Sequence, residues 1–382
     1  MTSSIYLDHA ATTPLRPEVR AAMEPYLGPD DFGNPSSQHQ HGQRARRALD
    51  RARDTFASSI DCEASEITFT SGGTEADNMA LFGIMQANRQ RGNHFITTLI
   101  EHDAVLNTAK FLEGLGFDVT YVAPNSEGQI DPSHIEAAIT PATTLISVMT
   151  ANNEMGAIQP VGEIGAIARR HGIVFHTDAV QAFGQIPVSP EELNADLISF
   201  SAHKIYGPKG TGALYVRTGV SIESFLHGGG QERDRRSGTE NVAGIVGFAE
   251  AAELAVRERE QNSERLTKLR AFFLQTLRGK IPDTVMNGPS ANRLPNNVNI
   301  SFADLDAEAI LLSLDLHRIS ASSGSACSSG SIEPSHVLTA MGLPNERVLS
   351  AIRFSLGRKT TEEEIARTVD VLTEITQRMR QI

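Results

Sequence analysis

Short apolar runs alternate with longer helical patterns between residues 67 and 216, and this alternation constrains the fold more than any other feature of the chain. Most of the runs are apolar on both faces, as strands are when helices cover both sides of a sheet. The pattern at 161–171 stops at Gly172, which favours a helix with a glycine C-cap. Alternating strands and helices predict an α/β domain with a mostly parallel central sheet. The strands are expected at residues 67–70, 94–98, 118–122, 144–149, 173–177, 197–200 and 212–216.

The alternation is lost after residue 256. Residues 257–277 form a long, polar, helical pattern, which predicts an exposed connecting helix. A strand is expected at 297–302, and helices are expected at 307–314 and 361–379. Strands and helices that do not alternate predict a smaller α+β domain.

We therefore expect two domains in this chain of 382 residues. Residues 16–256 would form the large domain, and residues 1–15 and 257–382 would form the small one. Seven of the twelve residues at 320–331 are serine, and Cys327 lies among them. A segment of such small, polar residues adds little to a core, which predicts a mobile loop carried by the small domain.

Composition excludes several classes of function. The chain has 34 basic and 46 acidic residues, and a net charge of -12 disfavours general nucleic-acid binding. It contains no apolar run long enough to span a membrane, and its first residues lack the basic and apolar segments of a signal peptide. Its two cysteines, Cys62 and Cys327, exclude a disulfide scaffold and a zinc site made of cysteines alone. A soluble protein of the cytoplasm is expected.

Reactive residues follow most of the predicted strands, at the edge where an open α/β sheet binds its ligands. Gly73 and Thr74 precede a helix and would offer free N–H groups and a helix dipole to a phosphate, although a plain strand-to-helix turn has the same pattern. His102 follows the next strand, and Asn153 follows the strand at 144–149. Asn153 suits either a turn or a polar ligand.

Two charged residues follow the next strand ends. A carboxylate at Asp178 would be costly to bury unless it meets donors or a cation such as a protonated pyridine nitrogen, and capping of the next helix is the alternative. Lys204 follows the strand at 197–200. A desolvated lysine has a lowered pKa and can bind an aldehyde covalently, whereas the alternative is a side chain that extends to solvent.

Together, these residues are the parts that bind pyridoxal phosphate. The cofactor needs a lysine for its aldehyde, an acid for its ring nitrogen, a cradle for its phosphate and a ring to cover its face. This order along successive strand ends is far less probable by chance than any one member. The sequence therefore predicts a pyridoxal-phosphate enzyme.

Nine short segments spread over the chain form a specific combination of motifs. They are residues 6–14, 33–37, 69–75, 152–156, 176–181, 199–204, 236–239, the loop around Cys327, and residues 352–358. In this combination the chain resembles the cysteine desulfurases of the NifS/IscS type. These belong to the class V aminotransferase family of fold-type I pyridoxal-phosphate enzymes, so the resemblance implies that fold and that activity.

The resemblance assigns roles around the cofactor ring. It implies that Lys204 binds the cofactor aldehyde, that Asp178 binds the pyridinium nitrogen and that Gln181 binds the phenolic oxygen. His102 would stack on the ring and take part in proton transfer. Asn153 would contact both the cofactor and the substrate.

The resemblance also assigns the phosphate site. Gly73, Thr74, Ser201 and His203 would hold the phosphate within one subunit. In the family, the equivalent of Thr239 reaches the phosphate from the neighbouring subunit, which implies a homodimer.

The implied reaction converts L-cysteine to L-alanine. Asn153 and Arg353 would bind the substrate carboxylate, although a surface ion pair is the other explanation for Arg353. Lys204 would act as the base at the α-carbon, and His102 could deprotonate the incoming thiol. The thiolate of Cys327 would attack the substrate sulfur and carry it as a persulfide to an acceptor protein. Cys62 has no motif around it and is expected to be structural or incidental.

Three alternatives remain open from the sequence. A selenocysteine lyase or an aminotransferase could use the same fold, and a non-enzymatic sulfur-delivery scaffold is a more distant alternative. Iron–sulfur cluster assembly is the leading pathway for the sulfur. Transfer to DNA, to tRNA or into another thiolation pathway is also compatible with the sequence.

Overall fold

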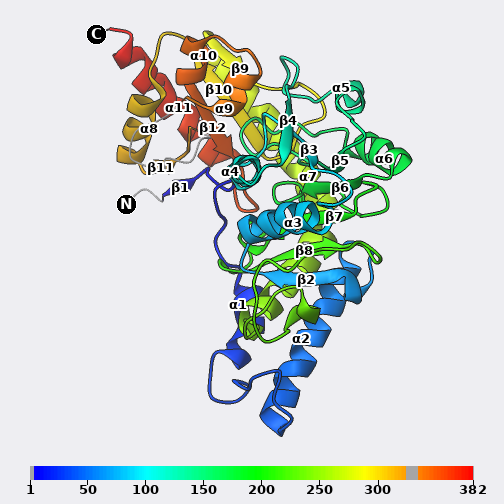
Figure 1. The fold of residues 1–382 in the computed structure, drawn as a ribbon. Coiled ribbons are helices and arrows are strands. Elements are labelled where there is room, and N and C mark those ends of the chain that lie inside the picture. Colours follow the sequence, from blue (N-terminus) through cyan, green and yellow to red (C-terminus); the bar gives the residue numbers. More distant parts are fainter. Residues whose placement is uncertain (1–3, 324–333, 382) are drawn as a thin grey trace.

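A computed structural model describes residues 4–323 and 334–381 of the chain. A seven-stranded sheet, with strand order β2-β8-β7-β6-β5-β3-β4, forms its centre (Figure 1). Strand β8 runs antiparallel to the other six strands, which share one direction, so the prediction of a mostly parallel sheet is confirmed. The strands are β2 (Ile67–Thr70), β3 (His94–Thr98), β4 (Asp118–Val122), β5 (Thr143–Ser147), β6 (Val174–Asp178), β7 (Leu197–Ser201) and β8 (Gly212–Val216).

Helices cover both faces of this sheet, which explains why its strands are apolar on both sides. Phe95 and Leu145 pack into a cluster with the buried faces of α3 (Gly73–Ala87) and α4 (Asp103–Gly114). The next residue on each strand, Ile96 or Ile146, packs into a cluster on the other side. That side includes α6 (Val161–His171), which ends as predicted at Gly172, with a left-handed φ of 63°. The short helix α5 (Pro132–Ala137) packs against α6.

A second, smaller group of elements is built from the C-terminal part of the chain. Its antiparallel sheet has the order β12-β10-β9, and a two-stranded parallel sheet pairs β1 with β11. The strands are β1 (Ile5–Tyr6), β9 (Thr284–Met286), β10 (Asn297–Phe302), β11 (Ile319–Ser320) and β12 (Ala351–Ser355). The helices of this part of the chain are α8 (Ala307–Leu316), α9 (His336–Ala340), α10 (Asn345–Leu349) and α11 (Glu362–Met379). The buried residues of α8 and α11 pack into the small core, whereas those of α9 and α10 pack into the core of the large sheet.

One helix, α7 (Val242–Lys280), runs for 39 residues through both groups of elements. Phe248 in its first half packs with the large sheet, whereas Leu269 and Phe273 in its second half pack into the core of the small group. A connecting helix at 257–277 is therefore confirmed, but it is exposed on one side only, because a stripe of its residues is buried. Apolar residues three and four positions apart form a stripe that is buried, although the residues between them are polar. The predicted domain boundary at residue 256 lies inside this helix, and the domain division stays a prediction.

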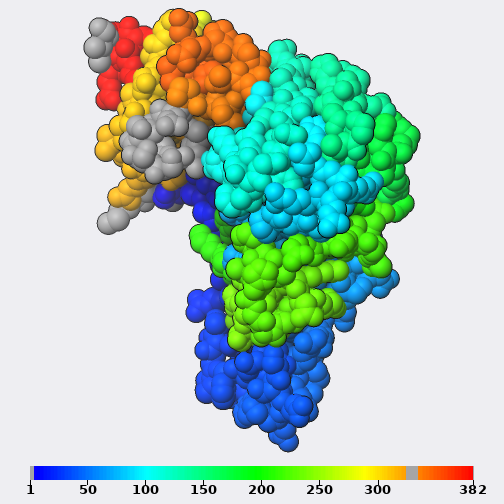
Figure 2. Space-filling model, in the orientation of Figure 1, coloured from blue at the N-terminus to red at the C-terminus, as the bar shows by residue number. Residues whose placement is uncertain are grey.

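The N-terminal helices α1 (Pro17–Met23) and α2 (Gln40–Ser58) project from one end of the molecule (Figures 1 and 2). Both pack against α7. Four 3₁₀ turns complete the described elements: η1 (Glu24–Tyr26), η2 (Ala64–Glu66), η3 (Ala202–Lys204) and η4 (Glu232–Asp234). Among the described residues, no helix combines the length and the apolar character that crossing a bilayer requires.

A buried ion pair fixes the loop before α7 to α2. Arg53 Nη2 lies 2.6 Å from Glu232 Oε1, and both side chains are almost completely buried. The Glu232 carboxylate also accepts a hydrogen bond from the N–H of Phe69 on β2, an edge strand of the large sheet. Glu232 has a φ of 49°, a left-handed conformation that is unfavourable for a side chain of this kind. The ion pair therefore holds a strained turn in place.

The substitution Glu232→Gln is expected to destabilise the protein by about 3–5 kcal/mol, because it leaves the buried Arg53 guanidinium without a counter-charge. Urea unfolding of the purified protein measures the effect. The matched control is Asp50→Asn, which breaks the exposed Arg46–Asp50 pair and should cost less than about 1 kcal/mol. Equal effects of the two variants would show that the buried pair has no special structural role.

Candidate active site

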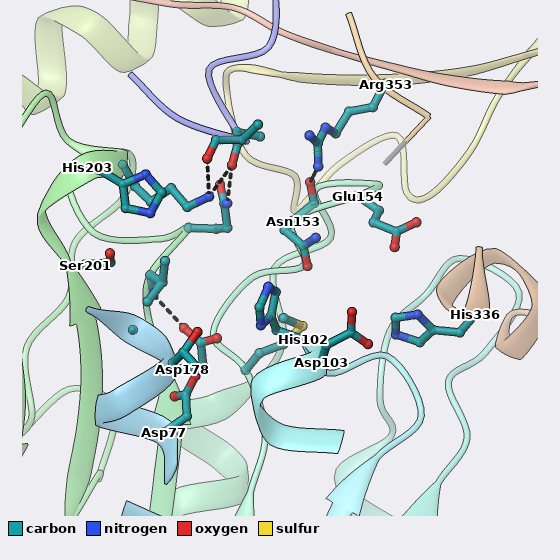
Figure 3. Close-up of a pocket in the computed structure, with 18 residues that line it drawn as sticks. Asp77, His102, Asp103, Asn153, Glu154, Asp178, Ser201, His203, His336 and Arg353 are labelled. Atoms are coloured by element: carbon teal, nitrogen blue, oxygen red, sulfur yellow. Dashed lines mark hydrogen bonds between the residues drawn. The ribbon is translucent and has the colours of Figure 1, made fainter. Parts of the chain in front are cut away.

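A cavity of about 350 Å³ opens at the carboxyl edge of the parallel strands, a size suited to a small ligand (Figure 3). The end of β6, the turn after β7 and the start of α3 form one side of it, and β12 and the N-terminal segment reach it from the small group of elements. The structure brings ten predicted site residues to its walls: Gly73, Thr74, His102, Asn153, Asp178, Gln181, Ser201, His203, Lys204 and Arg353.

Lys204 ends the 3₁₀ turn that follows β7. Its Nζ atom donates hydrogen bonds to the carbonyl oxygens of Ala10 at 2.6 Å and Ala11 at 2.8 Å. Burial, followed by the nearby Arg353 guanidinium, lowers the pKa of Lys204 to about 8, and the carboxylates of Asp178 and Asp8 oppose this shift. About a fifth of the amine is therefore neutral at about pH 7.4, far more than for an ordinary lysine, and the neutral form is the one that attacks an aldehyde.

Asp178 is the last residue of β6 and is buried at the cavity wall. Its Oδ1 atom accepts a hydrogen bond of 2.8 Å from the N–H of Val180. Burial raises the pKa of Asp178, and the nearby His102 and Lys204 oppose that shift. A carboxyl group in this position gains stability as an anion when a cation lies beside it.

The start of α3 forms a cradle of backbone N–H groups. Gly73 is the first residue of this helix, and the N–H groups of a first helical turn have no acceptor within the helix. A Cβ atom on Gly73 would lie 2.8 Å from Val180 Cγ2, so a larger residue would close this part of the cavity. Ser201 and His203 line the same region. Burial and the charge of Lys204 lower the pKa of His203 to about 4, so it acts here as a neutral polar group.

His102 caps the N-terminus of α4. Its Nδ1 atom accepts a hydrogen bond of 3.1 Å from the N–H of Ala104. In the neutral ring the proton is therefore on Nε2. The ring lines the cavity between Asp178 and Asn153 (Figure 3).

Arg353 extends from β12 toward the cavity and is almost completely buried (Figure 3). Its Nη1 atom donates to the carbonyl oxygen of Asn153 at 3.1 Å, and its Nη2 atom lies 2.9 Å from Asp8 Oδ1. The buried position contradicts a surface ion pair as the explanation for Arg353. A planar guanidinium at a cavity wall suits a carboxylate ligand.

The N-terminal segment supplies contacts that sequence reasoning did not assign. The Ala10 carbonyl accepts from both Lys204 and Gln181, whose Nε2 atom lies 2.8 Å away. Thr12 Oγ1 lies 3.1 Å from His203 Nδ1. The sequence indicated this segment only through the motif at residues 6–14, which contributes to the family resemblance but to which the resemblance assigned no binding or catalytic role.

Buried acids form a second feature that sequence reasoning missed. Asp77, on α3, lines the cavity, and its Oδ1 atom has no hydrogen-bond partner. Glu101 accepts from Thr98 Oγ1 and from the N–H of Met149 through one oxygen, while its other oxygen has no partner. Burial raises the pKa of Glu101 to about 8 and also raises the pKa of Asp77, which the nearby Asp178 increases further. The signal for Asp77 was an aspartate one helical turn after Gly73, within a largely apolar helix.

Thr239 is exposed and does not line the cavity of this chain, and its predicted reach into a neighbouring subunit stays a prediction.

Cys327 lies outside the described residues. The flanking residues meet the site on both sides. Ser322 exchanges backbone hydrogen bonds with Arg353, the Ser335 hydroxyl donates to the carboxylate of Glu154, and His336 lines the cavity.

The other cysteine, Cys62, lies away from this cavity. Burial and the nearby carboxylates, of which Glu66 acts most strongly, raise the pKa of the Cys62 thiol to about 12. A thiol with such a pKa is protonated near neutral pH, and the protonated form is a poor nucleophile.

The donor groups fit pyridoxal phosphate. The cavity has a desolvated amine for an aldehyde, a buried carboxyl group for a protonated ring nitrogen and a helix N-terminus for a phosphate. The amine of Lys204 and the carboxyl group of Asp178 lie on adjacent strand ends, so one ring can meet both.

Comparisons with known proteins agree on one family. Residues 5–368 match the family described as aminotransferase class-V. The cysteine desulfurase IscS of Dictyoglomus turgidum is 51% identical over 382 residues, which are 100% of this chain and 97% of the relative. A solved NifS-like protein has a TM-score of 0.93 at 38% identity, over 98% of this chain and 100% of its own. The structure of SspA in complex with cysteine has a TM-score of 0.81 at 38% identity, over 93% of this chain and 99% of its own.

The substitution Asp77→Asn is expected to gain stability relative to the wild type as the pH rises from 5 to 8. Burial holds the pKa of Asp77 in the folded protein above its value in the unfolded chain. Between those two values the folded protein retains a proton that the unfolded chain has released. Each pH unit in that window therefore costs the wild type up to about 1.4 kcal/mol, a loss that the neutral Asn avoids.

Urea unfolding of the cofactor-free protein at several pH values measures this difference. The matched control is Asp131→Asn at the start of α5. Hydrogen bonds from Ser133 lower the pKa of Asp131, so its difference from the wild type should be constant above pH 5. A difference for Asp77→Asn that is also constant with pH would contradict a raised pKa at this position.

Proposed function

Because the chain belongs to the aminotransferase class-V family and, within it, to the NifS/IscS-type cysteine desulfurases, we propose that it converts L-cysteine to L-alanine and transfers the sulfur to an acceptor. One observation carries this proposal. The desolvated amine of Lys204, the carboxyl group of Asp178 and the guanidinium of Arg353 face a single cavity. This set can hold pyridoxal phosphate together with an amino acid.

The cofactor, when bound, supplies an electron sink that labilises bonds at the α-carbon of an amino acid. Lys204 would bind its aldehyde, Asp178 its protonated ring nitrogen and Gln181 its phenolic oxygen. His102 would cover the face of the ring, and Asn153 would contact the ring and the substrate.

The phosphate would lie at the start of α3. The N–H groups of Gly73 and Thr74 point to the helix terminus, where a negative charge is favourable. Ser201 and the neutral imidazole of His203 would donate further hydrogen bonds. Together these neutral donors bind an anion without placing a further cation beside Lys204.

The substrate would be held by its carboxylate on Arg353 and by the side-chain amide of Asn153. The Nζ atom of Lys204, as the free amine, would take the proton from the α-carbon. A pKa near 8 suits a group that must accept and then return a proton. His102 would take the proton of the substrate thiol on Nδ1. The ring would first have to release the N–H of Ala104, because Nε2 already carries the proton of the neutral ring.

Sulfur transfer would occur at Cys327. Its thiolate would attack the sulfur of L-cysteine, so that a sulfur–sulfur bond forms as the carbon–sulfur bond breaks. The electron pair of the broken bond stays with carbon, and protonation gives L-alanine. The contacts of Ser322 with Arg353 and of Ser335 with Glu154 support this role, because they join both flanks of the Cys327 segment to the walls of the cavity.

We further propose the setting in which the enzyme works. It would act in the cytoplasm as a homodimer, with Thr239 completing the phosphate site of the neighbouring subunit. A sulfur-acceptor protein would receive the persulfide. Iron–sulfur cluster assembly is the leading destination, and another thiolation pathway is the alternative.

The substitution Cys327→Ala is expected to reduce alanine release from L-cysteine by on the order of 10³-fold or more, since it removes the attacking nucleophile. Cofactor binding, followed by visible absorbance, should be unchanged. The control Cys62→Ala should release alanine within about twofold of the wild-type rate, because its thiol is protonated near neutral pH. Alanine release by Cys327→Ala at the wild-type rate would instead favour a lyase that breaks the carbon–sulfur bond without a cysteine nucleophile.

The substitution Thr239→Val is expected to weaken cofactor binding by about tenfold, the cost of one hydrogen bond to a charged phosphate. Light scattering should give twice the mass of the chain for this variant and for the wild type. Mixing Thr239→Val subunits with Lys204→Ala subunits should restore one complete site in each mixed dimer. If wild-type cofactor affinity does not return on mixing, Thr239 does not act across an interface.

A further inference from the structure

The segment after β1 lines the cavity at Ala10 and Ala11 and contacts Arg353 through one acid, Asp8. Asp8 Oδ1 lies 2.9 Å from Arg353 Nη2, with 19% of the Asp8 side chain and 4% of the Arg353 side chain exposed. On its other nitrogen, Arg353 donates to the Asn153 carbonyl oxygen at 3.1 Å. Because the two contacts take different nitrogens of one planar group, they fix both the position and the plane of the guanidinium.

Asp8 is itself fixed to the strand that carries Arg353. The N–H of Ser355, on β12, donates to the Leu7 carbonyl oxygen at 2.7 Å, and the N–H of His9 donates to the Ser355 carbonyl oxygen at 3.3 Å. The Tyr6 hydroxyl donates to the Asp8 carbonyl oxygen at 3.0 Å. The acid and the arginine therefore lie on paired segments, and their relative position is set by backbone hydrogen bonds.

The charge of Asp8 also matters to the lysine. The Arg353 guanidinium lowers the pKa of Lys204, whereas the Asp8 carboxylate raises it. Without Asp8, the positive charges of Arg353 and Lys204 would lie near each other with one carboxylate fewer to offset their repulsion. Asp8 therefore makes it less costly to place an arginine close to the reactive amine.

We propose that Asp8 is a positioning residue, which presents the Arg353 guanidinium to the carboxylate of an amino-acid substrate. This inference rests on the proposed function. An arginine whose plane is already fixed loses little conformational freedom when a carboxylate binds. Among the influences on the pKa of Lys204, the charge of Asp8 is the smallest, so Asp8 would act mainly on substrate affinity and only weakly on the chemical steps.

The opposite role makes a distinct prediction. If Asp8 occupied the place of the substrate carboxylate and had to be displaced, its removal would strengthen binding. The sign of the change in KM therefore separates a positioning residue from an internal competitor.

The experiment compares Asp8→Ala and Asp8→Asn with the wild-type holoenzyme. Alanine release gives KM and kcat for L-cysteine, and the visible spectrum gives the affinity for L-alanine, which carries no sulfur. For Asp8→Ala we expect KM to rise and L-alanine affinity to fall by about tenfold, the effect of losing a charge-assisted hydrogen bond. kcat should stay within about twofold, as expected when an interaction contributes equally to ground-state and transition-state binding.

The KM and the L-alanine affinity of Asp8→Asn should lie between those of the wild type and Asp8→Ala, because the amide oxygen still accepts from Arg353 but carries no charge. It also keeps the test decisive if the alanine variant fails to fold. The control is Asp283→Ala, which removes the exposed partner of Arg380 and should leave KM unchanged.

An unchanged or lowered KM in both Asp8 variants would overturn the inference. So would a fall in kcat with no change in KM. If the wild type itself released no alanine from L-cysteine, the proposed function would fail, and the inference would fail with it.

Discussion

The ammonium group of Lys204 lies on the carbonyl oxygens of Ala10 and Ala11, and the rest of the site depends on this contact. Lys204 follows the carboxyl end of β7 in the large sheet, whereas Ala10 follows β1, which pairs with β11 in the C-terminal part of the chain. A lysine is buried at low cost only when its donors find acceptors. The cavity is therefore complete only when residues nearly 200 positions apart come together.

The charges around this cavity are distributed unevenly. Asp77 and Asp178 are buried in one wall, with the buried Glu101 close enough to raise the pKa of Asp77, while the helix N-terminus at Gly73 and the neutral His203 form another side. Acids crowded in this way favour a cation between them and the lysine, and backbone N–H groups favour an anion. A ligand with a protonated ring at one end and a phosphate at the other would thus be held in a single orientation.

Much of the fold could be predicted because its signal is local. The predicted strands and the glycine that ends α6 were confirmed. A strand buried on both faces requires a continuous apolar run, and a left-handed C-cap favours glycine, so both can be recognised in the local sequence. The burial of α7 was not foreseen. Its second half is mostly polar, with a narrow apolar stripe that includes Leu269 and Phe273. Whether such a stripe is buried depends on the elements that pack against it, which the local sequence does not show.

The same distinction separates the two parts of the site. Lys204 and Asp178 follow strands, so topology alone brings them to one edge of the sheet. Asp8 is 345 positions away from Arg353 and lies in a segment without periodicity, so nothing local indicates that the two meet. Yet such a contact determines which way the guanidinium faces. Residues that follow strands provide the reactive groups, whereas long-range contacts set their orientation, and that second level becomes visible only in the folded chain.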